Sequence, residues 1–159
     1  MKRLLLLLLL SGLFVSAAAA QSTVFLVRHA EKAAGGGTDP NLSDAGRKRA
    51  ARLAQVLKDA GISRIFVTQF KRTKQTAAPL ATRLHLTPIS VPAENSAQLN
   101  TQLRASSGNV LVVGHSNTIS AMIAALGITT SIQIGENDYD NLFVLVRHGT
   151  PRLIRLHYP

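Results

Sequence analysis

The sequence predicts a three-layer α/β/α sandwich, in which a mostly parallel central sheet lies between two layers of helices and a hairpin ends the chain. Three observations predict this fold. Short apolar runs rich in Val, Ile and Leu alternate with longer stretches that have helical spacing. The last two apolar runs are joined by a turn around Gly149 and Pro151, which is typical of a hairpin. The part of the chain over residues 21–159 has a length typical of a single domain.

The first elements are a buried strand over residues 23–28, a glycine-rich loop, and a helix that begins after Ser43. Serine is a favoured helix N-cap. Apolar residues then recur at helical spacing until Gly61, which is expected to end the helix. A second strand is expected over residues 64–68.

A second helix is expected over residues 71–84, and Pro79 should kink it or divide it in two, because proline lacks a backbone N–H. The alternation then continues to the end of the chain. Strands are expected over residues 87–91, 109–113, 142–146 and 153–157, and helices over residues 97–105 and 117–126.

Residues 1–20 have the layout of a secretory signal peptide. Lys2 and Arg3 precede an unbroken leucine run, and Ala18 and Ala20 supply the small side chains that signal peptidase favours. The apolar run is shorter than the roughly 20 residues that cross a bilayer. We therefore expect cleavage near Ala20, a secreted or periplasmic domain over residues 21–159, and no membrane attachment after cleavage. A retained membrane anchor is the alternative.

The amino-acid composition excludes several kinds of site and classes of partner. The chain contains no Cys, which excludes a disulfide, a thiolate zinc site and a thiol nucleophile. Lys and Arg number 18 against 8 Asp and Glu, and this balance attracts anions. Nucleic acid is not an expected partner, because the chain has no Trp and no stripe in which basic and aromatic residues alternate. Most of these charges are interpreted as a solvated basic surface.

Two of the predicted strands are each followed by a histidine at the carboxyl end. Arg28 and His29 close the first strand, and His115 follows the strand over residues 109–113. The carboxyl ends of parallel strands meet at one edge of an α/β sheet, where ligands bind, so these side chains are expected to converge. Arg72, which follows the second strand and opens a helix, is a third contributor.

Three segments resemble the signatures of the histidine phosphatase superfamily, which has the phosphoglycerate mutase-like fold. They are LVRHAEK near the start of the domain, FKRTKQTA in the middle and VVGHSNT later. They occur in the order of the family, and with the intervening LSDAGRKRA the resemblance covers essentially all of residues 21–159. The similarity is greatest to the small single-domain phosphatases. Ala30 departs from the family, which more often has Gly there; a methyl group is tolerated unless the position needs a positive φ.

The resemblance implies a phosphatase without a metal or other cofactor, which hydrolyses phosphomonoesters through a covalent phosphohistidine on His29. Guanidinium and imidazole groups would surround the phosphoryl oxygens, and the helix that begins near Asn117 would add its N–H groups. The substrate-binding residues implied in this way are Arg28, Arg72, His115, Ser116 and Asn117.

The general acid that protonates the leaving oxygen must be a carboxyl group within hydrogen-bonding reach of it. Glu94 is the predicted acid, because it lies between the second and third signatures, where related single-domain members carry theirs. Glu31, beside the nucleophile motif, is the main alternative, and Asp39 is a further one. An ordinary solvated loop carboxylate is the alternative interpretation of Glu94.

A second copy of the arginine-histidine-glycine signature occurs at Arg147, His148 and Gly149. Only ten residues follow it, which is enough for a return strand but not for a helix, a second arginine and a second histidine. Arg147 and His148 are therefore interpreted as hairpin residues. His85 and His157 belong to no motif and are interpreted as structural.

A phosphatase is favoured over a mutase because a domain over residues 21–159 has little room for the segments that close a mutase pocket, so water would reach the phosphohistidine. A phosphorylated small molecule or a phosphoprotein is the expected substrate. Two alternatives remain open, namely a protein phosphohistidine phosphatase and a module that binds phosphate or polyanions without turning them over. The sequence leaves the oligomeric state open.

Overall fold

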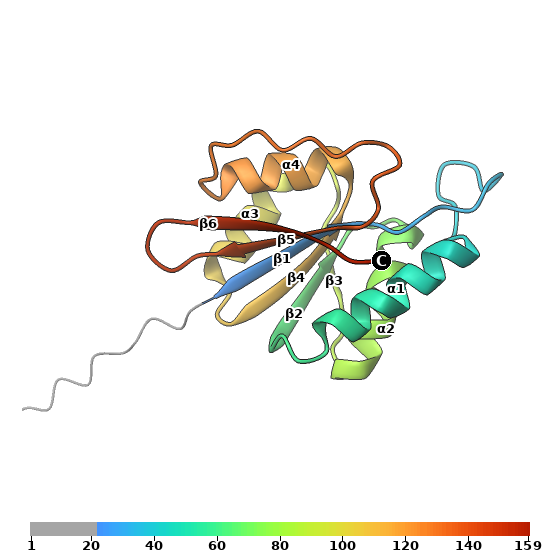
Figure 1. Ribbon diagram of the computed structural model, residues 1–159, viewed down its shortest axis with the longest axis horizontal. Helices are drawn as coiled ribbons and strands as arrows, with labels where there is room; N and C mark the ends of the chain where they lie inside the picture. Colours follow the sequence, from blue (N-terminus) through green and yellow to red (C-terminus); the bar gives the residue numbers. More distant parts are fainter. Residues whose placement is uncertain (1–21) are drawn as a thin grey trace, which may run out of the picture.

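A computed structural model describes residues 22–159, in which a six-stranded sheet lies between two pairs of helices (Figure 1). The predicted signal peptide and its cleavage site lie outside these residues. Among the described residues, no helix is both long enough and apolar enough to cross a membrane. The elements in chain order are β1 (Thr23–Arg28), α1 (Asp44–Leu57), β2 (Ile62–Val67), α2 (Lys71–Leu84), β3 (Ile89–Ser90), α3 (Ser96–Ala105), β4 (Asn109–Gly114), α4 (Ser116–Ala125), β5 (Asn141–Val146) and β6 (Arg152–His157).

The strand order of the sheet is β3-β2-β4-β1-β5-β6. The pairs β2–β3, β2–β4 and β1–β4 are parallel, whereas β5 pairs antiparallel with β1 and β6 pairs antiparallel with β5. The predicted mostly parallel sheet and C-terminal hairpin are therefore confirmed. In the β1–β4 register Arg28 lies opposite Gly114, so the residues that follow these two strands begin side by side.

The helices cover both faces of the sheet, with α1 and α2 on one side and α3 and α4 on the other (Figure 1). Leu53 and Leu80 pack on the first face, and Leu103 and Ile123 pack on the second. Each side chain of this size contributes about 1.5–3 kcal/mol when it is fully buried. Because β1 and β4 are covered on both faces, they are apolar at nearly every position rather than at alternate ones.

Helix α1 begins as predicted, because the Oγ of Ser43 accepts the backbone N–H of Gly46 at 3.1 Å. The helix ends at Leu57 and not at Gly61. A turn follows it, in which the Ala60 N–H donates to the Leu57 carbonyl, and Gly61 then takes a φ of +62° before β2 starts. Strand β2 also begins at Ile62, two residues earlier than predicted, since exposed polar residues interrupt its apolar pattern there.

Helix α2 is one continuous helix through Pro79, so of the two predicted effects, a kink or a division, the division does not occur. Ala77 and Leu80 are fully buried on either side of the proline, and their packing on the sheet offsets the missing backbone hydrogen bond. The helix ends at Leu84. His85 follows in the left-handed conformation with a φ of 54°, and the Leu86 N–H donates to the Ala81 carbonyl at 2.9 Å. His85 therefore has the structural role predicted for it.

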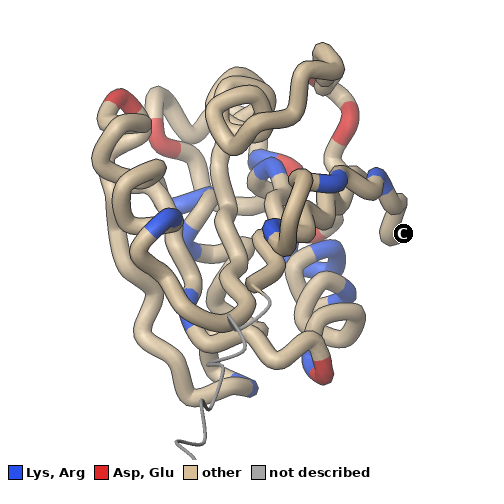
Figure 2. Tube along the Cα trace, turned by 90° about the vertical axis from the view of Figure 1, so that its left-hand side faces the viewer, with Lys and Arg blue, Asp and Glu red and all other residues tan. Residues whose placement is uncertain are grey.

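The basic residues are spread over strands, helices and loops and do not gather in one stripe (Figure 2). Figure 2 views the molecule from the end where β1 begins, which is the end opposite to His29. This distribution agrees with the interpretation of most of these charges as a solvated surface.

Candidate active site

The two motif histidines lie next to each other at the carboxyl ends of the adjacent strands β1 and β4. The backbone N–H of His29 donates to the Gly114 carbonyl at 2.9 Å, which extends the ladder of the sheet by one bond. The imidazole rings of His29 and His115 meet edge to face with 5.3 Å between their centroids. The sheet thus brings together two side chains that are 86 positions apart in sequence.

A cleft of about 480 Å³ opens above these rings. All seven residues predicted for the site contribute to its wall, together with four others. The lining residues are Arg28, His29, Gln69, Phe70, Arg72, Ala93, Glu94, His115, Ser116, Asn117 and Thr118.

His29 is almost fully buried, with 4% of its surface exposed. Its Nδ1 lies 2.8 Å from the Ala30 carbonyl oxygen. A carbonyl accepts hydrogen bonds but cannot donate them, so in the neutral ring Nδ1 carries the hydrogen and Nε2 carries the lone pair. Ala30 itself is buried and does not take a positive φ, which explains why this position accepts a methyl group.

Both histidines are held in the neutral form. Burial lowers the pKa of His29 to about 4, the hydrogen bond to Ala30 opposes this shift, and the nearby His115 and Arg28 add to it. Burial also lowers the pKa of His115 to about 4, with further contributions from Arg72 and Arg28. A neutral imidazole is the form that can act as a nucleophile.

These shifts predict a pH dependence of stability. The pKa of a histidine in the unfolded chain is about 6.5, so between about pH 4 and about pH 6.5 the unfolded state binds protons that the native state does not bind. The free energy of unfolding is therefore expected to increase as the pH rises through this window. Urea unfolding at several pH values in this range measures the slope. A double variant, His29→Asn with His115→Asn, should have a smaller slope, and an equal slope would contradict the two pKa values.

The guanidinium group of Arg28 is fixed beside the nucleophile. Its Nη1 donates to the carbonyl oxygens of Gly135 and Glu136, at 2.7 Å each. Its Cζ lies 4.5 Å from the centroid of the Tyr139 ring, a cation–π distance. Within residues 22–159, the buried Nε of Arg28 has no hydrogen-bond partner.

Arg72 lies at the start of α2 and lines the cleft. Its Cζ stacks over the Phe70 ring at 4.2 Å, and its Nη1 lies 3.8 Å from Asp39 Oδ1. Burial lowers the pKa of Arg72, Asp39 opposes this shift, and the like charge of Arg28 adds to it. The Nε of Arg72 is also buried without a partner in the described part of the chain. Two guanidinium groups with unused buried donors make this cleft suited to an anion.

The N-terminus of α4 adds to the positive character of the cleft. His115 is the N-cap residue of this helix, and Ser116 and Asn117 form its first turn. The Thr118 Oγ1 accepts the His115 backbone N–H at 2.8 Å, which fixes the start of the helix against the end of β4. Unpaired N–H groups at a helix start favour a negative charge nearby.

The three candidate acids lie in different surroundings. Glu94 lines the cleft, and its Oε2 accepts a hydrogen bond of 3.3 Å from Gln69. Glu31 accepts hydrogen bonds from Arg49 Nε at 2.9 and 3.0 Å; burial alone would raise the pKa of Glu31, but this pairing gives a net lowering. Asp39 Oδ1 accepts the backbone N–H of Lys71, the first residue of α2.

The residues that the structure describes contain no group of three or more His, Asp and Glu that could hold a metal ion.

Of the site residues that were not singled out from the sequence, three lie against the two histidines. Thr68 follows β2, and its Oγ1 lies 3.1 Å from Nε2 of His115. Phe70 packs edge to face on His115, with 5.4 Å between the ring centroids. Tyr139 lies 6.1 Å from His29, ring to ring. The position of Phe70 two residues before Arg72 was a usable signal, whereas nothing in the sequence around Tyr139 distinguishes it from other loop residues.

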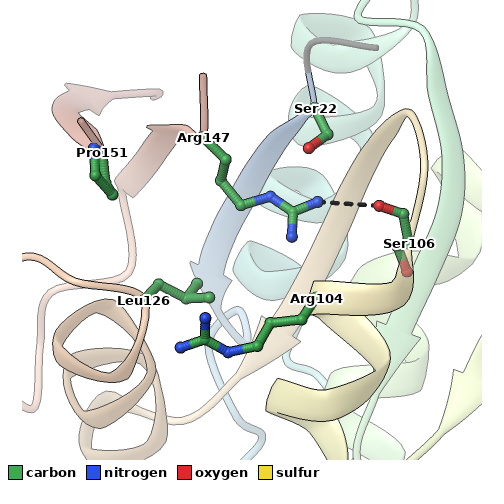
Figure 3. A pocket seen from close by; sticks show the side chains of 6 residues that line it. All are labelled: Ser22, Arg104, Ser106, Leu126, Arg147 and Pro151. Atoms are coloured by element: carbon green, nitrogen blue, oxygen red, sulfur yellow. Dashed lines mark hydrogen bonds between the residues drawn. The ribbon is translucent and has the colours of Figure 1, made fainter. Parts of the chain in front are cut away.

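The second arginine-histidine-glycine motif lies at the other end of the sheet, because β5 runs antiparallel to β1. Arg147 and His148 begin the turn between β5 and β6, so their interpretation as hairpin residues is confirmed. The Arg147 guanidinium reaches the end of α3, where it donates to the Leu103 carbonyl. It also donates to the carbonyl of Ser106, as Figure 3 shows. Arg104 likewise donates to the Ala125 carbonyl at the end of α4. Arg104 and Arg147 line a second cleft, shown in Figure 3. Because helix C-termini favour cations, we interpret both arginines as capping residues of α3 and α4 and not as ligand-binding residues.

The comparisons with known proteins agree with the geometry. The family model for the histidine phosphatase superfamily (branch 1) matches residues 24–100. A search of curated proteins found no match. The protein histidine phosphatase SixA, solved with tungstate, is 21% identical with a TM-score of 0.67, over 85% of this chain and 96% of that one. A mycobacterial glucosyl-3-phosphoglycerate phosphatase is 18% identical with a TM-score of 0.68, over 86% and 97% of the two chains.

A third solved structure, a putative α-ribazole-5′-phosphate phosphatase from Escherichia coli, is 15% identical with a TM-score of 0.71, over 86% of this chain and 96% of that one. At these identities the likeness establishes the fold, and the predicted phosphoglycerate mutase-like architecture is confirmed. The segment matched by the family model begins in β1 and ends in α3, and it contains Arg28, His29, Arg72 and Glu94. The match over residues 24–100 is therefore to the histidine phosphatase superfamily, the family that the sequence motifs resemble.

Proposed function

We propose that the protein is a phosphatase that hydrolyses phosphomonoesters through a phosphohistidine on His29. The observation that carries the proposal is a buried, neutral imidazole beside two guanidinium groups whose Nε donors are buried and unused among the described residues. Two arginines and the start of α4 supply the positive charge that a phosphoryl group requires, so the reaction is proposed to need no metal ion.

In the first step, the Nε2 lone pair of His29 attacks phosphorus and the bond to the leaving oxygen breaks. The carboxyl group of Glu94 donates its proton to that oxygen, and the alcohol departs. Arg28, Arg72 and His115 donate hydrogen bonds to the phosphoryl oxygens as charge develops on them. In the second step, water attacks phosphorus, the Glu94 carboxylate takes a proton from the water, and the P–N bond breaks to release phosphate.

The covalent intermediate provides the test of the proposed function. The protein is mixed with ³²P-labelled 4-nitrophenyl phosphate and denatured in alkaline detergent after a short reaction time. We expect a protein-bound label that survives alkali and is lost in acid, as for an N-linked phosphoryl group, and that is absent from His29→Ala. The same label should appear in His148→Ala, which changes the histidine of the second motif. A label that is stable in acid, or turnover without any label, would exclude the phosphohistidine.

Glu94→Gln is expected to lower kcat/KM for alkyl phosphates by about 10²-fold, and to have a much smaller effect on kcat/KM for 4-nitrophenyl phosphate, because kcat/KM contains only the steps up to the loss of the leaving group. An alkoxide needs a proton to leave, whereas nitrophenolate leaves readily without one. Steady-state kinetics with both substrates measures the difference. Asp59→Asn, which changes an exposed carboxylate paired with Lys58, is the matched control and should affect neither substrate. Equal losses with both leaving groups would remove Glu94 from the role of acid.

Phosphorylated protein is the second substrate class, since one of the similar structures is named a protein histidine phosphatase. A panel that contains alkyl phosphates, aryl phosphates and a phosphohistidine peptide separates the two classes by kcat/KM.

The proposal also includes export of the domain, which rests on the sequence of residues 1–20. The N-terminal residue of the protein recovered from the cell exterior would be Gln21 if cleavage occurs as predicted.

A further inference from the structure

We propose that the segment Gly135–Tyr139 is a positioning device for Arg28, which leaves only one edge of the guanidinium group available to a phosphoryl group. The segment acts through Arg28 and makes no bond to the substrate. The inference rests on the proposed function for its catalytic meaning, and its test includes measurements that do not require turnover.

Both hydrogens of Arg28 Nη1 are used within the protein. Nη1 carries two hydrogens, and its contacts with the Gly135 and Glu136 carbonyl oxygens, both 2.7 Å, use both of them. A guanidinium group can bind an anion through its end, formed by Nη1 and Nη2, or through its side, formed by Nε and Nη2. The two carbonyls occupy Nη1 and so remove the end-on edge.

The side-on edge forms no hydrogen bond within the described residues. Nε of Arg28 is buried and has no hydrogen-bond partner within residues 22–159. Arg28 is only 7% exposed, so little water can take the place of that partner. A phosphoryl group that accepts one bond from Nε and one from Nη2 would satisfy both donors at once.

The stacking on Tyr139 fixes the plane of the same guanidinium group. Its Cζ lies 4.5 Å from the centroid of the Tyr139 ring, and the Tyr139 ring in turn lies 6.1 Å from the His29 ring. The tyrosine ring therefore sets the plane, and the carbonyls set the rotation within it. Together they determine the direction of the Nε–Nη2 edge relative to the nucleophile.

The segment itself is held by a local turn. The Gly135 N–H donates to Oδ2 of Asp138 at 2.9 Å, and the Asp138 N–H donates to the Gly135 carbonyl at 3.1 Å. This turn fixes the carbonyl that Arg28 binds. Asp138 forms no hydrogen bond with Arg28 among the described residues. Loss of its carboxylate should nevertheless make the turn more mobile, and the orientation of Arg28 should then be less well fixed.

Binding of inorganic phosphate, the product, is the first measurement, by isothermal titration calorimetry. Asp138→Ala and Tyr139→Leu are each expected to weaken phosphate binding about tenfold, because small misplacements of a bidentate group are costly. Tyr139→Phe keeps the ring and should restore the affinity of the parent. Asp140→Ala is the matched control, since Asp140 pairs with His157 on β6 and not with the turn. Circular dichroism establishes that each variant is folded.

A double-variant cycle with Arg28→Met identifies the path of the effect. If the segment acts through Arg28, Asp138→Ala and Tyr139→Leu cause no further loss of phosphate affinity in the Arg28→Met background. Equal losses in both backgrounds, or no loss in the parent, would overturn the proposal.

The proposed function and the positioning device can fail separately. If the parent binds no phosphate, the proposed function fails, and the device is then judged by NMR of the Arg28 guanidinium group. Its rotation should be slow in the parent, because Nη1 is held by two carbonyls, and faster in Asp138→Ala. Rotation that is equally fast in both proteins would overturn the device.

Discussion

Replacement of His29 by alanine is expected to lower kcat/KM for 4-nitrophenyl phosphate by about 10⁴-fold or more, since the reaction loses the atom that accepts the phosphoryl group. The His29 side chain is buried and its Nδ1 is fixed by the Ala30 carbonyl. A water molecule in the alanine variant would not be held in the same position, so it could not replace the imidazole as the nucleophile. Inorganic phosphate should still bind, because the arginines remain. Steady-state kinetics and calorimetry on the same preparation measure both quantities.

The second motif supplies the control for this experiment. His148→Ala changes a histidine that also follows an arginine but lies in the turn after β5, at the opposite end of the sheet. Its kcat/KM should equal that of the parent. An active His29→Ala protein would remove the covalent intermediate from the mechanism, and a dead His148→Ala protein with a normal unfolding midpoint would mean that the site has been assigned to the wrong motif.

Arg28→Lys is the variant with the second largest expected effect, a loss of about 10²–10³-fold in kcat/KM. Lysine keeps the charge but has three N–H donors in place of five, so bonds to the Gly135 and Glu136 carbonyls would leave one donor for the phosphoryl group in place of a parallel pair. The loss should therefore appear in kcat as well as in KM. A variant that raises KM alone would show that Arg28 binds the substrate without favouring the transition state.

Arg147→Lys is the matched control for Arg28→Lys. Arg147 caps the end of α3 and lies far along the sheet from His29, so its replacement should change the free energy of unfolding and leave kcat/KM unchanged. Denaturant unfolding and kinetics separate the two effects. A loss of activity in Arg147→Lys equal to that in Arg28→Lys would indicate that both act through stability.

The convergence of His29 and His115 followed from the sequence because it depends on features that local patterns encode. Continuous apolar runs identify buried parallel strands, and the carboxyl ends of such strands share one edge. The N-cap at Ser43 was equally readable, since it needs only a side-chain oxygen at the right position.

Other features depend on contacts between distant segments, which no local pattern contains. Pro79 weakens a helix by a known local mechanism, yet the burial of Ala77 and Leu80 keeps α2 continuous. The sequence also did not predict which basic residue pairs with each carboxylate. Glu94 is supported over Glu31 as the acid only because Arg49, on α1, pairs with Glu31 in the structure. Tyr139 stacks on Arg28 across a long separation in sequence, so its place in the site became visible only in three dimensions.

The backbone bond between His29 and Gly114 has a consequence for how this scaffold can diverge. The spacing of the two imidazoles is set by neighbouring strands of one sheet, a distance that varies little between proteins. Positions around the cleft other than Glu94 and Gly135–Tyr139 can therefore change while the reacting pair stays in register. New substrate preferences can arise on such a scaffold without any period in which the chemistry itself is lost.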